Sequence, residues 1–186
     1  MQHVTKTVTI LSEPGPLYRF WHDFENLPRF MYHLKEVETL GDGRSHWVAK
    51  APNNQNVEWD AEITEDRPNE RIAWRTVEPS EVQHSGSVTF SRAPGRRGTE
   101  VTVELVYEAK GGKVGAAIAK LFGEEPSQQV ADDLRRFKQV AETGEVVLSD
   151  GSIEGIGKPI TKQEPSRPHE EEEEEAMVSH RGEVTK

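Results

Sequence analysis

Three polar side chains occur within apolar strand patterns and are the residues best suited to chemistry: His84, Tyr107 and Arg75. His84 has the same strand parity as Val82 and Phe90, so its imidazole is expected to point inward. An inward imidazole needs a hydrogen-bond partner, and it can act as a general base or orient a bound ligand. Tyr107 offers a phenol on the inner face of its strand, and Arg75 could pair with a ligand carboxylate or with an adjacent strand. These groups favour orientation of a ligand over proton transfer, so no catalytic residue is predicted.

Other constellations of reactive residues are missing from the sequence. It has no cysteine and no HExxH motif, and His22, His33 and His46 lack the spacing of metal ligands. No serine lies in a GxSxG elbow, and the glycine-rich stretch 111–115 lacks the Gly-Lys-Ser/Thr ending of a phosphate loop. We therefore predict no metal site and no cofactor.

Short alternating segments separated by turn residues predict seven β-strands. The first is at residues 4–10, where apolar residues alternate with threonine and lysine. The others are expected at residues 33–40, 45–51, 55–64, 71–77, 82–92 and 99–109. Turn signals such as Gly41-Asp42-Gly43 separate them. Strands at this spacing typically form a meander, in which each strand pairs with its predecessor.

Helical periodicity occurs in two places. Residues 17–24 place apolar side chains on one helical face, and a second short helix is expected through residues 27–31. Both are rich in aromatic residues, which would pack in the core or form a lid over a cavity mouth. The longest helical pattern runs over residues 111–144, with a break or kink expected near Pro126. Such a helix must bury its apolar stripe, and an antiparallel sheet curled around it is the available surface.

This order of elements resembles the START-like superfamily, which includes polyketide cyclase/dehydrase-like proteins and lipid carriers. The resemblance covers residues 3–146 and rests on stretches 20–37 and 57–75, on the pair GSVTF and GTEVTVEL, and on LRRFKQVAETGE at 134–145. It implies an α+β helix-grip fold, with a seven-stranded antiparallel sheet curved around a long C-terminal helix and two short helices after the first strand. It also implies a hydrophobic cavity between the sheet and the long helix. None of these stretches is a catalytic signature.

Period-2 counting along the strands and the stripe of the long helix select the residues that would line such a cavity. They are Trp47, Trp59, Trp74, His84, Phe90, Leu105 and Tyr107 from the strands, with Val130, Leu134 and Phe137 from the helix. The direction of Trp74 stays open because its strand is apolar on both faces. A cavity lined in this way suits an apolar ring or acyl chain, with a few polar groups fixing its orientation. The alternative is that these side chains fill the interior.

The C-terminal part of the chain differs from the rest in composition. Residues 145–186 contain 11 acidic and 5 basic residues, a net charge of −6 out of −10 for the whole chain. This stretch includes three prolines and the glutamate run 170–175, and it has almost nothing to bury. We therefore predict one domain at residues 1–146 and a disordered acidic tail at residues 147–186.

Composition also restricts the partners and the compartment. The acidic balance argues against nucleic-acid binding, which needs clustered lysine and arginine. No apolar run approaches about 18 residues and no basic-then-apolar leader occurs, so neither a membrane span nor a signal peptide is expected. Together with the absence of cysteine, this predicts a cytoplasmic location.

Three classes of function follow from these observations. The leading prediction is a carrier or sensor that binds a hydrophobic small molecule or lipid between the sheet and the C-terminal helix. The alternatives are an enzyme like the polyketide aromatase/cyclases, and a partner-binding or chaperone-like protein that uses the acidic tail. The sequence leaves open the identity of the ligand, the occurrence of catalysis and the oligomeric state.

Overall fold

The computed structural model describes residues 2–51, 56–80, 82–109 and 126–144. The strands are β1 (Gln2–Ile10), β2 (Leu34–Gly41), β3 (Arg44–Lys50), β4 (Asn56–Arg67), β5 (Arg71–Thr76), β6 (Val82–Arg92) and β7 (Thr99–Ala109). The helices are α1 (Pro14–His22), the 3-10 helices η1 (Phe24–Arg29) and η3 (Pro94–Arg96), and α3 (Pro126–Thr143).

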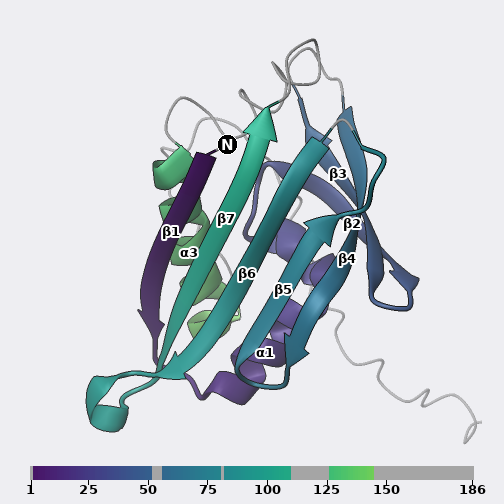
Figure 1. Ribbon diagram of the computed structural model, residues 1–186. Coiled ribbons are helices and arrows are strands. Elements are labelled where there is room, and N and C mark those ends of the chain that lie inside the picture. Colours follow the sequence, from purple (N-terminus) through teal and green to yellow (C-terminus); the bar gives the residue numbers. More distant parts are fainter. Residues whose placement is uncertain (1, 52–55, 81, 110–125, 145–186) are drawn as a thin grey trace, which may run out of the picture. The chain divides into compact units, whose positions relative to one another are not determined.

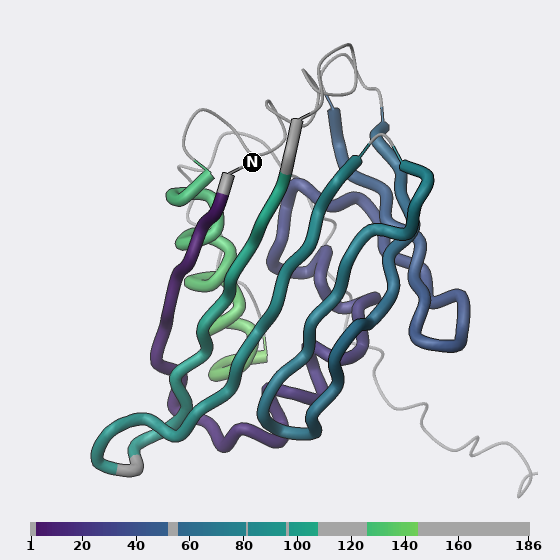
Figure 2. The backbone as a smooth tube through the Cα atoms, in the orientation of Figure 1, coloured from purple at the N-terminus to yellow at the C-terminus, as the bar shows by residue number. Residues whose placement is uncertain are grey.

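The seven strands form one antiparallel sheet in the order β1-β7-β6-β5-β4-β3-β2 (Figure 1). From β2 to β7 every strand pairs with its predecessor, as a meander requires. β1 closes the order by pairing with β7, with Val4 opposite Leu105 and Val8 opposite Val101. Figure 2 traces this path, in which the first strand lies beside the last one. The predicted α+β helix-grip fold with a seven-stranded sheet and short helices after the first strand is confirmed.

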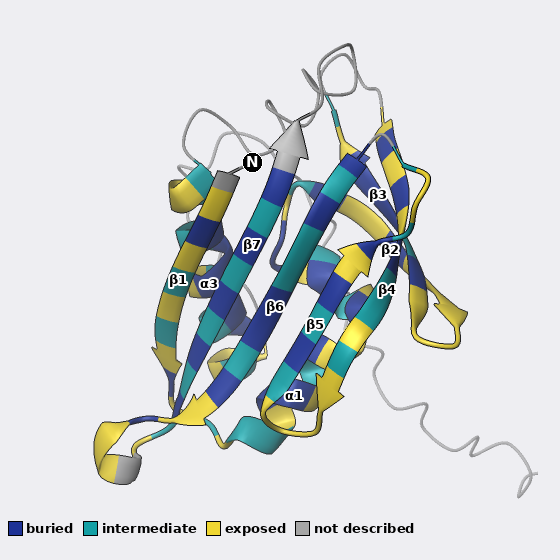
Figure 3. Ribbon diagram, in the orientation of Figure 1, coloured by how far each residue is buried: buried dark blue, intermediate teal, exposed yellow. Residues whose placement is uncertain are grey.

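α1, η1 and α3 lie on one face of the sheet, and the core lies between these helices and the strands (Figure 1). α3 buries Val130, Leu134, Phe137 and Val140, which recur every three or four residues and so share one helical face. The helix is tied to the end of β1, because the ammonium group of Lys138 donates to the backbone oxygen of Thr9 at 2.9 Å. Buried positions alternate with half-buried ones along β7 in Figure 3, as expected for a strand with one face on the core. The same alternation occurs along β6, except at residues 85–88.

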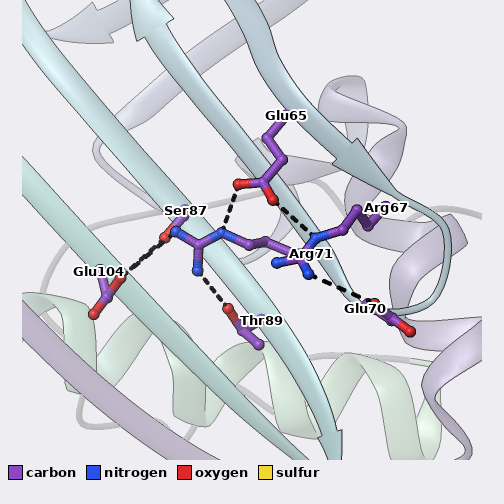
Figure 4. A network of polar contacts seen from close by, with 7 residues as sticks. All are labelled: Glu65, Arg67, Glu70, Arg71, Ser87, Thr89 and Glu104. Atoms are coloured by element: carbon purple, nitrogen blue, oxygen red, sulfur yellow. Dashed lines mark hydrogen bonds and ion pairs between the residues drawn. The ribbon is translucent and has the colours of Figure 1, made fainter.

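The outer face of the sheet carries charged and hydroxyl side chains that bridge neighbouring strands (Figure 4). Arg71 on β5 donates from Nε to Glu65 at 3.0 Å and from Nη1 to Thr89 at 2.8 Å. On the next pair of strands, the hydroxyl of Ser87 donates to Glu104 at 3.2 Å. This network holds β4 to β7 together from the side opposite the helices.

The strand boundaries agree with the predicted segments to within a few residues. The largest difference is β4, which continues to Arg67 although its predicted segment ends at residue 64. A register shift between Ile63 and Glu65 lets β4 stay paired with β5 beyond that point. The first part of the predicted long helix, residues 111–125, and the predicted tail with its boundary near residue 146 lie outside the described residues. Those assignments stay predictions.

Candidate functional site

A small internal cavity lies between the inner face of the sheet and α3, with a volume of about 20 Å³. The strands contribute Trp47, Trp59, Trp74, His84, Val103 and Leu105 to its wall. The helical side contributes Gln129, Val130, Asp133 and Leu134 from α3, Trp21 from α1, and Met31, His33 and Leu34 around the start of β2. This space holds about one water molecule, so the side chains of the wall fill most of the interior.

Three tryptophans surround the imidazole of His84. Trp47 and Trp59 are direct partners on β3 and β4, and their rings stack with centroids 5.8 Å apart. The ring of Trp47 also stacks on Trp74 at 6.3 Å. The centroid of the His84 ring lies 6.2 Å from Trp47, 6.1 Å from Trp59 and 6.3 Å from Trp74. Gly86 makes room for this arrangement, because a Cβ at that position would lie 2.6 Å from Cζ2 of Trp74.

The three indole N–H groups have different surroundings. Trp47 Nε1 donates to the hydroxyl of Ser45 at 2.8 Å inside the protein. Trp59 Nε1 and Trp74 Nε1 are equally buried, and within the described part of the chain no acceptor meets them. Their side chains belong to residues that are 5% and 2% exposed, so bulk water does not take the place of an acceptor. Nε1 of Trp21, on the helical side of the wall, is buried in the same way. Three indole donors of the cavity wall are therefore unsatisfied by the described residues, two of them on the strands.

Polar groups on α3 tie the helix to the segment that precedes β2. Arg136 donates from Nε to the backbone oxygen of Phe30 at 2.8 Å, and its guanidinium lies 4.2 Å from the ring centroid of Tyr32. Arg136 also forms an ion pair with Asp133 one turn earlier on α3. The second carboxylate oxygen of Asp133 lies 3.6 Å from Nδ1 of His33. These contacts of Arg136, here called the Arg136 latch, thus join α3 to the segment before β2.

Burial sets the protonation of the cavity groups. It lowers the pKa of His84 from 6.5 to about 4. Burial also lowers the pKa of His33 to about 3, with smaller contributions from His84 and Arg136. Both imidazoles are therefore neutral near pH 7. The same desolvation raises the pKa of Asp133 to about 7, although Arg136 acts in the opposite direction.

Seven of the ten predicted site residues line this cavity: Trp47, Trp59, Trp74, His84, Leu105, Val130 and Leu134. The open question about Trp74 is answered, since its ring faces the cavity. Phe90 and Phe137 do not line it; they pack around Trp21, with ring centroids 6.5 Å and 5.0 Å away. They belong to an aromatic cluster between α1, α3 and the far end of β6.

Tyr107 also lies outside the cavity lining. It is opposite His84 in the β6–β7 pairing and borders an open groove of about 540 Å³, together with Arg75 and Glu62. Arg75 forms an ion pair with Glu62 at 2.8 Å across the neighbouring strands. The simpler of the two expectations for Arg75, a contact with an adjacent strand, is the one that the structure shows.

The cavity also contains residues that the strand pattern does not select, most importantly His33 and Asp133. A signal for Asp133 is present in the sequence, because it lies three residues after Val130 and four before Phe137 and so shares their buried helical face. An acidic residue on an apolar stripe indicates a buried partner. His33 carries no such signal, since it precedes β2 and its position depends on the turn after η1.

Comparison with known proteins places this arrangement in a family. The sequence profile of the family described as polyketide cyclase / dehydrase and lipid transport matches residues 13–135. The chain belongs to this family. A START superfamily protein from Mycobacterium smegmatis has a similar structure, with a TM-score of 0.57, 19% identity and coverage of 74% of this chain and 98% of that one. The family match confirms the predicted resemblance, and the likeness to the START superfamily protein shows a shared fold.

Two relatives of higher identity extend over most of the domain. A crystal structure of a protein from Deinococcus radiodurans is 43% identical, has a TM-score of 0.64 and covers 77% of this chain and 99% of that one. An uncharacterised 17.2 kDa protein of Streptomyces lincolnensis is 33% identical over an alignment of 148 residues, and the alignment covers 76% of this chain and 91% of that protein.

Two further findings concern the described residues alone. None of their helices has both the length and the apolar character that a transmembrane helix requires. The same residues also include no group of three or more histidine, aspartate or glutamate side chains positioned to bind a metal ion.

Proposed function

We propose that this member of the family binds an apolar small molecule or lipid between the sheet and α3, as a carrier or sensor. The observation that carries the proposal is the cavity itself, which places two stacked tryptophans and a third indole opposite Val130 and Leu134 of the helix. An apolar wall with a few polar groups is the composition of most small-molecule sites. The family description, which includes lipid transport, supports the same reading.

The small volume means that a ligand must separate the walls. The strand wall is held by continuous pairing on both sides, so it is the stiffer part. The helical wall is held to the segment before β2 by side chains, chiefly through the Arg136 latch. Met31 adds an adaptable thioether side chain on this side. We therefore expect α3 and the residues before β2 to move apart when the ligand enters.

A cyclase-like reaction is the second candidate, and one observation favours it. His33 and Asp133 lie 3.6 Å apart in the same cavity wall as His84, so more than one group could exchange protons with a substrate. The pKa of Asp133, raised to about 7 by burial, suits a proton donor near neutral pH. Turnover of a poly-ketone substrate that is lost in both His33→Gln and Asp133→Asn would favour this candidate over binding alone.

Titration with the neutral fluorescent probe phenylnaphthylamine tests the binding proposal. Leu134→Asp puts a carboxylate into the cavity wall and should abolish the enhancement of probe fluorescence, because a buried charge without a partner is costly. The matched control is Leu40→Asp, at a position of β2 that is 52% exposed, and it should bind the probe as the unaltered protein does. Circular dichroism shows whether each variant is folded. Equal binding by a folded Leu134→Asp variant would contradict the proposal.

Two further predictions from the sequence stay predictions. A cytoplasmic location rests on composition, and the use of the acidic tail by a partner concerns residues outside the described ranges. Neither enters the binding proposal, which depends only on the cavity.

A further inference from the structure

We propose that the ligand carries a neutral hydrogen-bond acceptor, such as a ketone, ester or amide carbonyl, and that the indole N–H groups of Trp59 and Trp74 donate to it. This inference rests on the proposed function, since it names the class of ligand that the same cavity takes. The hydrogen-bonding groups and the charges of the cavity wall support it.

The hydrogen-bonding capacity of the wall points to an acceptor. An indole N–H can only donate, so Trp59 and Trp74 each need an acceptor. Among the described residues neither has one, while the third indole of the cluster, Trp47, is already paired with Ser45. Buried donors are nearly always satisfied in folded proteins, and a donor left without a partner destabilises the protein. A ligand oxygen with two lone pairs supplies the missing acceptor.

The charges around the cavity point to a neutral group. The described lining residues include no lysine or arginine that could compensate a carboxylate. Arg136 and Lys50 both lower the pKa of His33, but neither of them lines the cavity. The guanidinium of Arg136 is held by Asp133 and by the backbone oxygen of Phe30. A ligand carboxylate would instead share the cavity with Asp133 and with two neutral imidazoles. Uncompensated charge is strongly disfavoured in such surroundings, whereas a carbonyl is not.

The positions of the two donors are fixed by packing. Trp74 lies against Gly86, where any larger side chain would displace its ring, and Trp59 stacks on its direct strand partner Trp47. The donors therefore cannot turn away to find another acceptor without disrupting the cluster. Donors held in place by packing give selectivity for a polar group on an otherwise apolar ligand.

A chain-matched ligand series with matched variants tests the inference. Methyl nonyl ketone, undecane and undecanoate are each titrated as competitors of phenylnaphthylamine, against the unaltered protein and against Trp59→Phe, Trp74→Phe and Trp47→Phe. Phenylalanine keeps an aromatic ring but removes the N–H donor. We expect the ketone to bind more tightly than undecane and undecanoate. Trp59→Phe and Trp74→Phe should each weaken ketone binding about fivefold relative to undecane, the effect of one hydrogen bond.

The Trp47→Phe variant is the control, because its N–H group is already used by Ser45. It should change ketone and undecane binding by the same factor. Using the ratio of the two ligands removes any general loss of packing or stability. The inference is overturned if the ketone-to-undecane ratio is the same in all four proteins, or if undecanoate binds more tightly than the ketone. If neither the probe nor any competitor binds the unaltered protein, the proposed function itself fails and the donor assignment fails with it.

Discussion

The guanidinium of Arg136 on α3 donates to the backbone oxygen of Phe30 at 2.8 Å, and this bond joins the helical wall of the cavity to the segment before β2. Its donor is charged and its acceptor belongs to the backbone, so the geometry is set by the fold on both sides. Because the strand wall is held by continuous pairing, we expect the cavity to open where Arg136 joins α3 to the segment before β2.

Arg136→Met should therefore speed up ligand entry. The substitution keeps an unbranched apolar stem but removes the bond to Phe30 and the ion pair with Asp133. We expect a loss of about 2 kcal/mol in the free energy of unfolding, typical for a hydrogen bond of a charged donor. Association of phenylnaphthylamine, followed by stopped-flow fluorescence, should be faster than in the unaltered protein.

Arg135→Met is the control for this change. Arg135 is the next residue on α3, its side chain is 67% exposed, and it pairs with Asp132. Exposed ion pairs of this kind contribute little, so both stability and probe association should stay close to those of the unaltered protein. Identical association rates in the Arg136→Met and Arg135→Met variants would show that the latch does not limit entry.

Gly86→Ala should disturb the tryptophan cluster from the sheet side. The added Cβ would lie 2.6 Å from Cζ2 of Trp74 and 2.7 Å from Cδ2 of Leu105, so both side chains must shift. Overpacking of this kind typically costs about 1–3 kcal/mol. Urea unfolding followed by tryptophan fluorescence measures the loss, with Ser85→Ala as the neighbouring control on β6. An unchanged unfolding midpoint for Gly86→Ala would mean that Trp74 is not packed against the backbone as described.

His84 should make the protein sensitive to acid. Its pKa is lowered by burial from 6.5 to about 4, so between these values the unfolded chain binds a proton that the folded protein does not. Stability from this group is therefore intact above pH 6.5 and decreases as the pH falls. His33 acts in the same direction, whereas Asp133, with its pKa raised to about 7, acts in the opposite one.

His84→Gln removes a side chain that binds a proton only in the unfolded chain. The free energy of unfolding of the variant should therefore fall less steeply as the pH is lowered. Between pH 6.5 and pH 5 we expect the variant to lose about 2 kcal/mol less stability than the unaltered protein, from about 1.4 kcal/mol for each pH unit. Above pH 7 the two stability curves should run parallel. Urea titrations at several pH values measure the difference. Parallel curves over the whole range would show that His84 is not buried in its neutral form.

The outer network around Arg71 should contribute to stability without affecting the ligand. Arg71 contacts Glu65, Thr89 and Glu104 on the face opposite the cavity (Figure 4). Arg71→Met should cost about 1 kcal/mol, and less at high salt, because the partners are partly exposed. Probe affinity should not change.

The control Arg92→Met removes an ion pair with Glu13 in which both side chains are more than half exposed, and it should cost less stability. A drop in probe affinity on Arg71→Met would contradict this expectation, because it would show that the outer network influences the cavity.

The sheet and the main stripe of α3 were accessible from the sequence because both patterns are local. Period-2 alternation identifies a strand and its inner face without any knowledge of the partner strand. The same counting placed His84 and Trp59 correctly on that face. Because these local patterns define strands and a helix but not the ligand, the fold class could be predicted while the function could not.

Periodicity shows which face of a strand a residue lies on, but not where along the sheet the residue meets the cavity. His84 and Phe90 have the same parity on β6, but six residues separate them by about 20 Å. One therefore borders the cavity, and the other packs on α1 beside Trp21. Phe137 also lies outside the cavity lining, because α3 passes from the cavity at Leu134 to the aromatic cluster at Phe137 within one turn. His33 required knowledge of the chain path after η1, which no local pattern contains.

The most direct test of the binding proposal is a crystal structure of the protein grown with methyl nonyl ketone that carries a terminal bromine atom. Anomalous diffraction locates the bromine independently of the rest of the ligand. The proposal predicts a bromine peak between the sheet and α3, within contact of Leu105 or Leu134, and a displacement of α3 away from Trp47 relative to the unliganded protein. A peak confined to the outer face of the sheet, or an unchanged closed cavity in a crystal whose protein was saturated with ligand, would contradict it.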